Sequence, residues 1–318
     1  MIVTLTPNPS LDRALDLPRL EPGGVNRALA EHLHPGGKGL NVTRALTAHG
    51  VDSRAVLPVG GPDGDRMVAL LADQGVAAHP VRVAGHTRTN LTLAEATGRT
   101  TKVNSPGVAL TAPETDALLA AVKGELLPDA RALVIAGSLA AGQSVDLLTR
   151  AIDLAAEARV PVVVDTSGAP LAAAVAHGGL SLIKPNDEEL AELTGARLDT
   201  VGDVLAAART LIAGGLDAVL VSLGSHGALL VHADRSWWAG GPALVPLSTV
   251  GAGDCTLAGY LAADDHDPGA RLARAVAWGR AAVLLPGSAV PAPTDIHPTE
   301  VAVVADPDPA TALKELSS

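Results

Sequence analysis

The segment from Ser248 to Cys255 combines small residues and a carboxylate in an order suited to phosphate chemistry. It reads Ser-Thr-Val-Gly-Ala-Gly-Asp-Cys and leads into a pattern that predicts a helix. Small residues at 251–253 would let backbone amides point at an anion from the helix start, where amides and helix dipole bind phosphate. Asp254 could then take the proton of a hydroxyl that attacks the phosphate. The alternative is a glycine-rich turn in which Asp254 only caps the helix.

A second glycine-rich segment precedes another predicted helix. It reads Pro35-Gly36-Gly37-Lys38-Gly39 and is followed by Asn41, which we expect to open the helix. Glycines let a ligand approach the backbone closely, and the Asn41 amide could hold a hydroxyl group. The residue after Lys38 is Gly rather than Ser or Thr, so the segment lacks the P-loop pattern. A plain turn that feeds a helix would also explain it.

A third motif follows the first predicted strand. Thr4-Leu5-Thr6-Pro7-Asn8-Pro9-Ser10-Leu11-Asp12 reads as a strand, a proline-rich turn and a carboxylate. We expect Asp12 at the carboxyl end of the strand, where open α/β sheets bind ligands. Its two oxygens could accept hydrogen bonds from two hydroxyls, although an Asp that caps a turn fits the same pattern.

The elements that must hold these motifs alternate along the chain, and this alternation predicts an α/β fold. Apolar runs typical of buried strands precede Ala- and Leu-rich stretches typical of helices, which indicates a mostly parallel central sheet with helices on both faces. The predicted strands are 2–5, 55–59, 132–135, 162–165, 180–184 and 218–222, and the predicted helices are 41–49, 65–73, 144–158, 169–177, 187–194 and 254–262, with a short last helix after a loop at 305–309.

Two stretches interrupt this alternation. Residues 12–35 and 87–103 alternate polar and apolar residues without a helical pattern, and 91–100 resembles a hairpin with its turn at Gly98. We expect these stretches to form a small separate sheet. An irregular edge of the main sheet is the alternative.

Composition and charge exclude several classes of protein. The chain has 318 residues, 47% of them hydrophobic, which allows one large α/β unit with a small appendage. With no Phe, one Tyr and three Trp, an adenine pocket would have aliphatic walls. The net charge of -11 argues against non-specific nucleic-acid binding, so a polyanionic ligand needs local positive charge. We see neither a membrane span nor a signal peptide and expect a cytoplasmic protein. The single cysteine excludes an internal disulfide.

Six motifs occur in the order found in one family. They are Asn8-Pro9-Ser10-Leu11-Asp12, 36–42, Gly137-Ser138-Leu139, Ile183-Lys184-Pro185-Asn186 with Glu189, 222–227 and 251–254. With these motifs, the chain resembles the PfkB family of ribokinase-like carbohydrate kinases over essentially its whole length. The resemblance implies one ribokinase-like, Rossmann-type sandwich over residues 1–318, with a β-sheet lid formed by about 12–35 and 87–105. It also implies ATP as donor and Mg²⁺ as cofactor.

The resemblance also implies roles for individual residues. Asp254 would be the catalytic base, and Gly251, Ala252 and Gly253 would form an anion hole for the transferred phosphoryl group. Glu189 would organise Mg²⁺ through water. The acceptor would be bound by Asp12, Gly36, Gly37, Lys38, Asn41, Arg88, Asn104, Ser138 and Arg27, and ATP by Lys184, Asn186, Ser222, Gly224, Gly227, Ser248 and Gly279.

Four segments make the chain most similar to the hexose-phosphate branch of the family, the 1-phosphofructokinases. They are 25–27, 35–39, 87–90 and Asn104 with Pro106-Gly107. This implies phosphorylation of fructose 1-phosphate at its C6 hydroxyl to give fructose 1,6-bisphosphate. Fructose 6-phosphate and tagatose 6-phosphate are alternative acceptors, because small differences in lid geometry decide between them. A catalytically silent sugar-phosphate sensor is disfavoured by the intact Asp254 motif.

The remaining expectations concern the lid and Cys255. A lid over the sugar would exclude water and limit wasteful ATP hydrolysis. The family resemblance also implies a homodimer formed through the lid and allows a monovalent cation. Cys255 is either a small buried residue or, at a helix start, a thiol with a depressed pKa.

Overall fold

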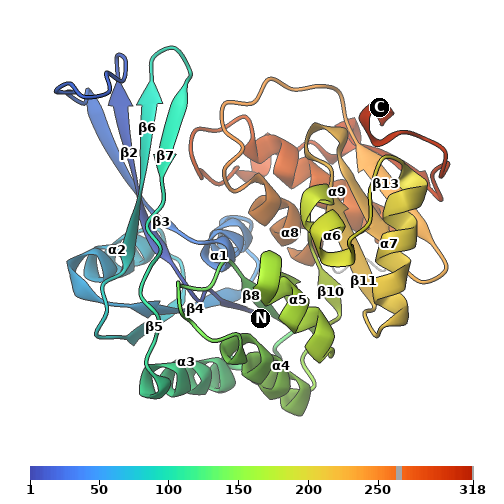
Figure 1. The fold of residues 1–318 in the computed structure, drawn as a ribbon, viewed down its shortest axis with the longest axis horizontal. Coiled ribbons are helices and arrows are strands. Elements are labelled where there is room, and N and C mark those ends of the chain that lie inside the picture. Colours follow the sequence, from blue (N-terminus) through green and yellow to red (C-terminus); the bar gives the residue numbers. More distant parts are fainter. Residues whose placement is uncertain (263–266, 317–318) are drawn as a thin grey trace.

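A computed structural model of the protein describes residues 1–262 and 267–316 (Figure 1). Its main feature is a 10-stranded sheet in the order β14-β13-β12-β11-β10-β9-β8-β1-β4-β5. Neighbours from β5 to β11 are parallel, whereas β12, β13 and β14 add an antiparallel edge. The strands are β1 (Ile2–Leu5), β4 (Ser53–Val59), β5 (Ala78–Arg82), β8 (Ala132–Ala136), β9 (Val162–Asp165), β10 (Leu182–Ile183), β11 (Ala218–Ser222), β12 (Ala228–Val231), β13 (Ser236–Gly240) and β14 (Ala302–Ala305).

Helices cover both faces of this sheet, as the alternation predicts. On one face lie α3 (Ala112–Glu125), α4 (Asp146–Ala158), α5 (Gly168–His177), α6 (Asp187–Thr194) and α7 (Val201–Ala213). The opposite face is covered by α1 (Lys38–Ala48), α8 (Ala252–Ala262) and α9 (Pro268–Ala282). Near the β4 end, α2 (Gly61–Asp73) packs with a third, smaller cluster of apolar side chains.

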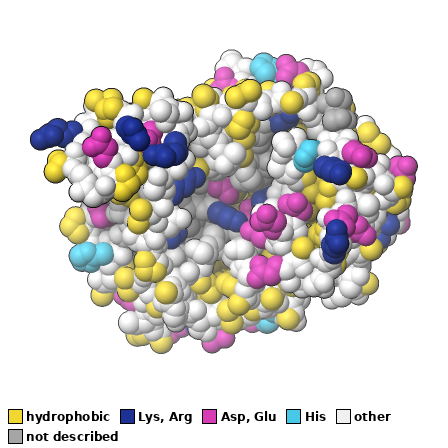
Figure 2. Space-filling view, turned by 45° about the horizontal axis from the view of Figure 1, so that its top comes forward, with side chains coloured by type: hydrophobic (Ala, Val, Ile, Leu, Met, Phe, Trp, Pro, Cys, Tyr) yellow, Lys and Arg dark blue, Asp and Glu magenta, His cyan; other side chains and the backbone are white. Residues whose placement is uncertain are grey.

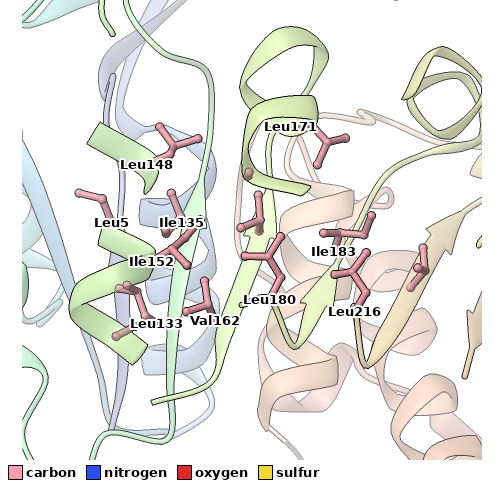
Figure 3. Packing of buried hydrophobic residues seen from close by; sticks show 14 of the residues in the cluster. Leu5, Leu133, Ile135, Leu148, Ile152, Val162, Leu171, Leu180, Ile183 and Leu216 are labelled. Atoms are coloured by element: carbon pink, nitrogen blue, oxygen red, sulfur yellow. The ribbon is translucent and has the colours of Figure 1, made fainter. Parts of the chain in front are cut away.

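The two cores follow from the two-residue repeat of a strand. In β8, Leu133 and Ile135 pack with the α3–α7 face, while Val134 and Ala136 pack with the α1, α8 and α9 face. Figure 3 shows the first of these clusters, in which Leu and Ile side chains from helices and strands interlock. Each such fully buried side chain contributes roughly 1.5–3 kcal/mol through the hydrophobic effect. The sheet is therefore a rigid platform whose strand ends can position polar groups.

The predicted small sheet is confirmed as a separate element. Its strands are β2 (Ser10–Leu17), β3 (Ala30–Gly36), β6 (Arg88–Glu95) and β7 (Thr100–Val103), in the order β3-β2-β6-β7. The β6–β7 hairpin turns at Gly98, which has a φ of +86°. Residues 18–29 lie outside the strands, so only parts of 12–35 form the sheet. Figure 1 shows it projecting from the main body beside α1.

Two local predictions about the site motifs are wrong. Helix α1 begins at Lys38 rather than Asn41, because the turn at Gly37 already has the chain entering the helix. Asp12 lies inside β2 rather than at the carboxyl end of β1, because pairing with β3 and β6 extends that strand back to Ser10.

Other differences concern elements without a clear pattern. Helices α3, α7 and α9 were not predicted, and the strand expected at 180–184 is reduced to β10. The expected last helix is a single 3₁₀ turn over Leu313–Glu315. Within the part of the chain that the structure describes, every helix is too short or too polar to cross a membrane.

Candidate active site

Two cavities adjoin each other at the start of α8. The first, which we call the sheet cavity, has a volume of about 450 Å³ and is lined by residues of both sheets, α1 and the start of α8. The second, the helix cavity, has a volume of about 480 Å³ and lies beside α8 and α9. Asn186, Ser222, Thr249 and Gly253 line both. Figure 2 shows the surface hollowed between the small sheet and the main body, with basic and acidic side chains together in the hollow.

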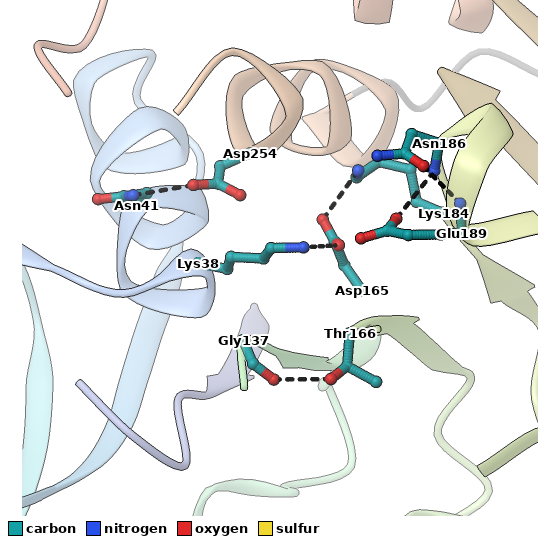
Figure 4. Close-up of polar contacts among 9 residues, drawn as sticks. All are labelled: Lys38, Asn41, Gly137, Asp165, Thr166, Lys184, Asn186, Glu189 and Asp254. Carbon is teal, nitrogen blue, oxygen red and sulfur yellow. Dashed lines mark hydrogen bonds and ion pairs between the residues drawn. The ribbon is translucent and has the colours of Figure 1, made fainter. Parts of the chain in front are cut away.

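Asp254 lies where these cavities meet. Its side chain comes from the first turn of α8 and is buried, with 6% of the residue exposed. The Asn41 side chain donates a hydrogen bond of 2.8 Å from Nδ2 to Asp254 Oδ2 (Figure 4). Burial and then the charge of Asp165 raise the pKa of Asp254 to about 6, against the opposing effects of Asn41, Lys38 and Lys184. A carboxylate with this pKa is ionised at neutral pH and basic enough to accept a proton.

The backbone before Asp254 has the form expected of an anion site. Gly251 adopts a φ of +79°, in the left-handed region that favours glycine, and α8 begins directly after it. A Cβ atom at Gly253 would lie 3.3 Å from Lys184 Nζ, so the ammonium group packs against this segment. Helix amides and a cation thus meet at one point between the cavities.

Arg44 fixes the orientation of the Asn41 amide. The buried guanidinium donates from Nη1 to Asn41 Oδ1 at 3.3 Å and to the backbone oxygens of Pro35 and Ser288 at 3.4 and 3.2 Å. With its oxygen held by Arg44, Asn41 must present its NH₂ group to Asp254. The hydrogen bond to the carboxylate is therefore set by a second layer of contacts.

Lys38, Asp165 and Lys184 form an ion-paired triad beside the sheet cavity. Lys38 in α1 donates from Nζ to Asp165 Oδ1 at 2.8 Å, and Lys184 Nζ is in ion-pair contact with Asp165 Oδ2 at 3.0 Å. Burial acts to raise the pKa of Asp165, but the two lysines outweigh it and the pKa is lowered. Burial likewise acts to lower the pKa of Lys38, yet Asp165 raises it overall. Asp165 and Lys38 are therefore both charged at neutral pH.

Asp12 is held by its neighbours in the small sheet. Its Oδ1 accepts hydrogen bonds from Ser10 Oγ at 2.7 Å and from Asn90 Nδ2 at 3.0 Å. A Cβ atom at Gly36 would lie 2.2 Å from Asp12 Oδ2, which explains the glycine there. Ser10, Asp12 and Asn90 all line the sheet cavity and form a polar wall on the side of the small sheet.

Arg88 supplies positive charge to the same cavity. It is half-buried, and its guanidinium donates to the backbone oxygens of Ser105 at 2.8 Å and Asn8 at 3.0 Å. Burial lowers its pKa somewhat, while Asp12 opposes that shift. A planar group with several donors is well suited to a phosphate.

Asn186 and Glu189 form a capping box at the start of α6. Glu189 N–H donates to Asn186 Oδ1 at 2.6 Å, and Asn186 N–H donates to Glu189 Oε2 at 2.9 Å. Both residues line the sheet cavity. Within residues 1–262 and 267–316, no group of three or more His, Cys, Asp or Glu is placed to hold a metal. Asn186 and Glu189 supply oxygen atoms, the kind of ligand that Mg²⁺ accepts directly or through water.

The structure brings most of the sequence-predicted site residues to the two cavities. Arg27 and Asn104 are exposed and line neither cavity, and Ser248 lines neither but accepts a hydrogen bond from the Val250 N–H. Gly36 touches Asp12 without lining a cavity. The sheet cavity is lined by Asp12, Gly37, Lys38, Asn41, Arg88, Ser138, Lys184, Asn186, Glu189, Ser222, Gly251, Gly253 and Asp254, and the helix cavity by Asn186, Ser222, Gly224, Gly227, Ala252, Gly253 and Gly279.

Four further polar residues lie at the site and were not predicted from the sequence: Asp165, Ser10, Asn90 and Thr166. Asp165 ends β9, so a carboxylate after the apolar run Val162–Val164 was the available signal, since strand ends meet at the ligand edge of such sheets. Thr166 donates from Oγ1 to the Gly137 backbone oxygen at 2.9 Å and lines the sheet cavity.

Of the two alternatives for Cys255, the structure supports the small buried residue. The residue is 3% exposed, and burial raises the pKa of its thiol to about 12. It therefore remains a neutral thiol at physiological pH, and the alternative of a reactive thiolate is not supported.

The chain is similar in sequence to known carbohydrate kinases. Residues 6–295 match the pfkB family of carbohydrate kinases. A 1-phosphofructokinase from Xanthomonas campestris pv. campestris is 40% identical over 82% of this chain and 83% of its own length. The ATP-dependent 6-phosphofructokinase isozyme 2 of Escherichia coli K12 is 39% identical over 80% of this chain and 82% of its own.

The fold is shared with a solved relative. The crystal structure of E. coli phosphofructokinase-2 in complex with potassium superposes with a TM-score of 0.87 at 37% identity, over 92% of this chain and 96% of that one. The expected ribokinase-like sandwich with a mostly parallel sheet is confirmed. The family match spans well over half of the sequence, and the chain belongs to the PfkB family of carbohydrate kinases.

Proposed function

We propose that this protein transfers the γ-phosphoryl group of ATP to the C6 hydroxyl of fructose 1-phosphate, giving fructose 1,6-bisphosphate. The observation that carries the proposal is the position of Asp254, buried at the junction of two cavities that share Thr249 and Gly253. A polar cavity for the acceptor and a second cavity for the nucleotide must adjoin where phosphoryl transfer occurs.

In the proposed reaction, Asp254 takes the proton of the acceptor hydroxyl. The hydroxyl oxygen bonds to the γ-phosphorus while the bond from that phosphorus to the β,γ-bridging oxygen breaks, and ADP leaves. A base with a pKa of about 6 is ionised at neutral pH and remains a useful proton acceptor. Backbone amides at 251–253 and the Lys184 ammonium would stabilise negative charge on the transferred group.

Residues of the sheet cavity would fix the acceptor. Arg88, Lys38 and Ser138 would bind its phosphate, because an acidic protein needs local cations for a polyanion. Asp12 and Asn41 would hold ring hydroxyls. Since Asn41 also contacts Asp254, acceptor position and base orientation would be set together.

The helix cavity would take the nucleotide between apolar walls. Val276, Val283 and Gly279 line it, in keeping with the scarcity of aromatic residues. Asn186 and Glu189 would hold Mg²⁺ through water, and the metal would neutralise charge on the ATP phosphates. A monovalent cation is a further expectation, supported by the potassium in the E. coli phosphofructokinase-2 structure.

Fructose 6-phosphate is the second candidate acceptor. The 6-phosphofructokinase isozyme 2 of E. coli is almost as similar to this chain as the Xanthomonas 1-phosphofructokinase, at 39% against 40% identity. Tagatose 6-phosphate would require the same base and a similar phosphate site.

An acceptor panel tests the proposed function. ADP release is measured in a coupled assay with fructose 1-phosphate, fructose 6-phosphate, tagatose 6-phosphate and ribose. We expect the highest kcat/KM with fructose 1-phosphate. A higher value with fructose 6-phosphate or tagatose 6-phosphate would replace the proposed acceptor, and fastest turnover of ribose would refute the hexose-phosphate assignment altogether.

Arg88→Lys serves as the matched variant in that panel. It keeps the charge but removes the planar fork, so KM for the phosphorylated acceptor should rise about 10-fold or more while KM for ATP stays unchanged. Arg82→Lys is the control, because Arg82 is exposed at the far edge of the main sheet and paired with Asp65. Equal effects of the two substitutions would argue against an anchoring role for Arg88.

We also propose that the small sheet acts as a lid and as a dimer interface. Val25 and Leu29, in the connection between β2 and β3, are 80% and 72% exposed, and Val103 in β7 is 56% exposed. These apolar side chains would lose contact with water at an interface. Sedimentation velocity at micromolar concentrations should give the mass of a dimer, and Leu29→Lys should shift it to that of a monomer. A wild-type monomer over the whole concentration range would contradict the proposed interface.

A further inference from the structure

We propose that Asp165 is a positioning residue that holds the ammonium groups of Lys38 and Lys184 at the transfer site, where both line the sheet cavity. The side chain of Asp165 is fully buried at the end of β9, and each carboxylate oxygen contacts one lysine. Lys38 reaches it from α1 and Lys184 from the turn after β10, so three separate elements converge on this carboxylate (Figure 4).

The exposure of the three side chains shows how the triad faces the cavities. The Asp165 side chain is 0% exposed, whereas those of Lys184 and Lys38 are 5% and 37% exposed. Lys38 and Lys184 line the sheet cavity, and Asp165 lies behind them. Asp165 would therefore not touch a substrate, and it would act only through the two lysines.

Each ammonium group can bind phosphate without leaving Asp165. An ammonium carries three N–H donors. Lys38 directs one of them at Asp165 Oδ1, and Lys184 lies in ion-pair contact with Oδ2 at 3.0 Å. At least two donors per lysine therefore remain for phosphate oxygens. Because a free lysine loses much rotamer freedom when it is fixed, a carboxylate that fixes both beforehand lowers the entropy cost of organising the site.

Asp165 also influences the base. The charged groups that act on Asp254 are Asp165, which raises its pKa, and Lys38 and Lys184, which lower it. Removal of the Asp165 charge should therefore lower the pKa of Asp254 towards the value of 3.8 ordinary for an aspartate. Removal of either lysine should shift it in the opposite direction.

Two variants, Asp165→Asn and Lys38→Met, test this role. Their kinase activity is measured with whichever acceptor the panel identifies. The result therefore does not depend on which sugar phosphate is the acceptor. The structure predicts that Asp165→Asn lowers kcat by about 10²-fold, because an amide cannot accept from both lysines. In the pH profile of kcat/KM, the acid limb reports the pKa of Asp254. This limb should move to lower pH in Asp165→Asn and to higher pH in Lys38→Met. The substrates titrate identically in every assay, so differences between variants belong to the enzyme.

Glu125→Gln is the matched control. Glu125 is also a buried carboxylate with two basic partners, Arg54 and His79, but it lines neither cavity. The Glu125→Gln substitution should lower the melting temperature and leave both kcat and the acid limb of the pH profile unchanged. Melting curves of all variants show whether the proteins are folded.

Two results would overturn the role of Asp165. One is a folded Asp165→Asn enzyme with wild-type kcat. The other is an acid limb that moves in the same direction in Asp165→Asn and Lys38→Met. Should Asp165→Asn not fold, the double variant Asp165→Asn/Lys38→Met removes one charge of each sign. Its acid limb should lie near the wild-type position while kcat stays low, and wild-type turnover in it would again overturn the role.

Discussion

Replacement of Asp254 by Asn is expected to lower kcat by about 10²–10⁴-fold, the range typical of a lost general base. The amide has nearly the same shape and can still accept the hydrogen bond from Asn41, so both cavities should keep their form. The dissociation constants of ATP and the sugar phosphate should therefore change little. A coupled assay gives kcat, and isothermal titration calorimetry gives the two dissociation constants.

Asp146→Asn is the control for this experiment. Asp146 also lies in the first turn of a helix, α4, but it is exposed and lines neither cavity. Its substitution should leave kcat at the wild-type value. If Asp254→Asn retained wild-type turnover as well, the carboxylate would only cap α8, and another group would have to accept the proton.

The sequence predicted the fold because the strand runs are short, apolar and separated by helical stretches. The run Val162–Asp165 could only be a buried strand, and the structure places it as β9 at the centre of the main sheet. The edge strands β12, β13 and β14 and the helix α9 were not predicted. Helix α9 carries Trp278 and alternating Ala and Arg residues, a pattern that does not separate one buried face clearly.

The glycine-rich motifs predicted the position of the site but not its charge network. Gly251 and Gly37 both mark turns with positive φ at helix starts, a signal that is local in sequence. In the triad of Lys38, Asp165 and Lys184, the contact between Lys38 and Asp165 joins residues 127 positions apart, so no spacing in the sequence indicates it. Arg27 and Asn104, which lie near strands of the small sheet in sequence, were predicted at the site. Their side chains nevertheless line neither cavity.

The burial that makes Asp254 a base should also make it destabilising, and this gives a prediction with a definite sign. Its pKa is about 6 in the folded protein, against an ordinary value of 3.8, so the native state binds the proton more tightly than the unfolded state. The free energy of unfolding should therefore fall as pH rises from about 3.8 to 6 and stay lower above that range. At 1.36 kcal/mol per pKa unit, the full effect is about 3 kcal/mol.

Asp254→Asn should consequently unfold at higher urea concentration than the wild type at pH 8, with a difference of about 3 kcal/mol or less that shrinks as the pH falls towards 4. Urea denaturation at a series of pH values measures it. Asp203→Asn should give the opposite sign, because hydrogen bonds from Thr200 and Asp199 lower the pKa of Asp203 and so stabilise its ionised form. A wild-type enzyme more stable than Asp254→Asn at pH 8 would mean that contacts of the Asp254 carboxylate outweigh the cost of its burial. In that case the ionised Asp254 would not lower the free energy of unfolding, and its role as a base would carry no cost in stability.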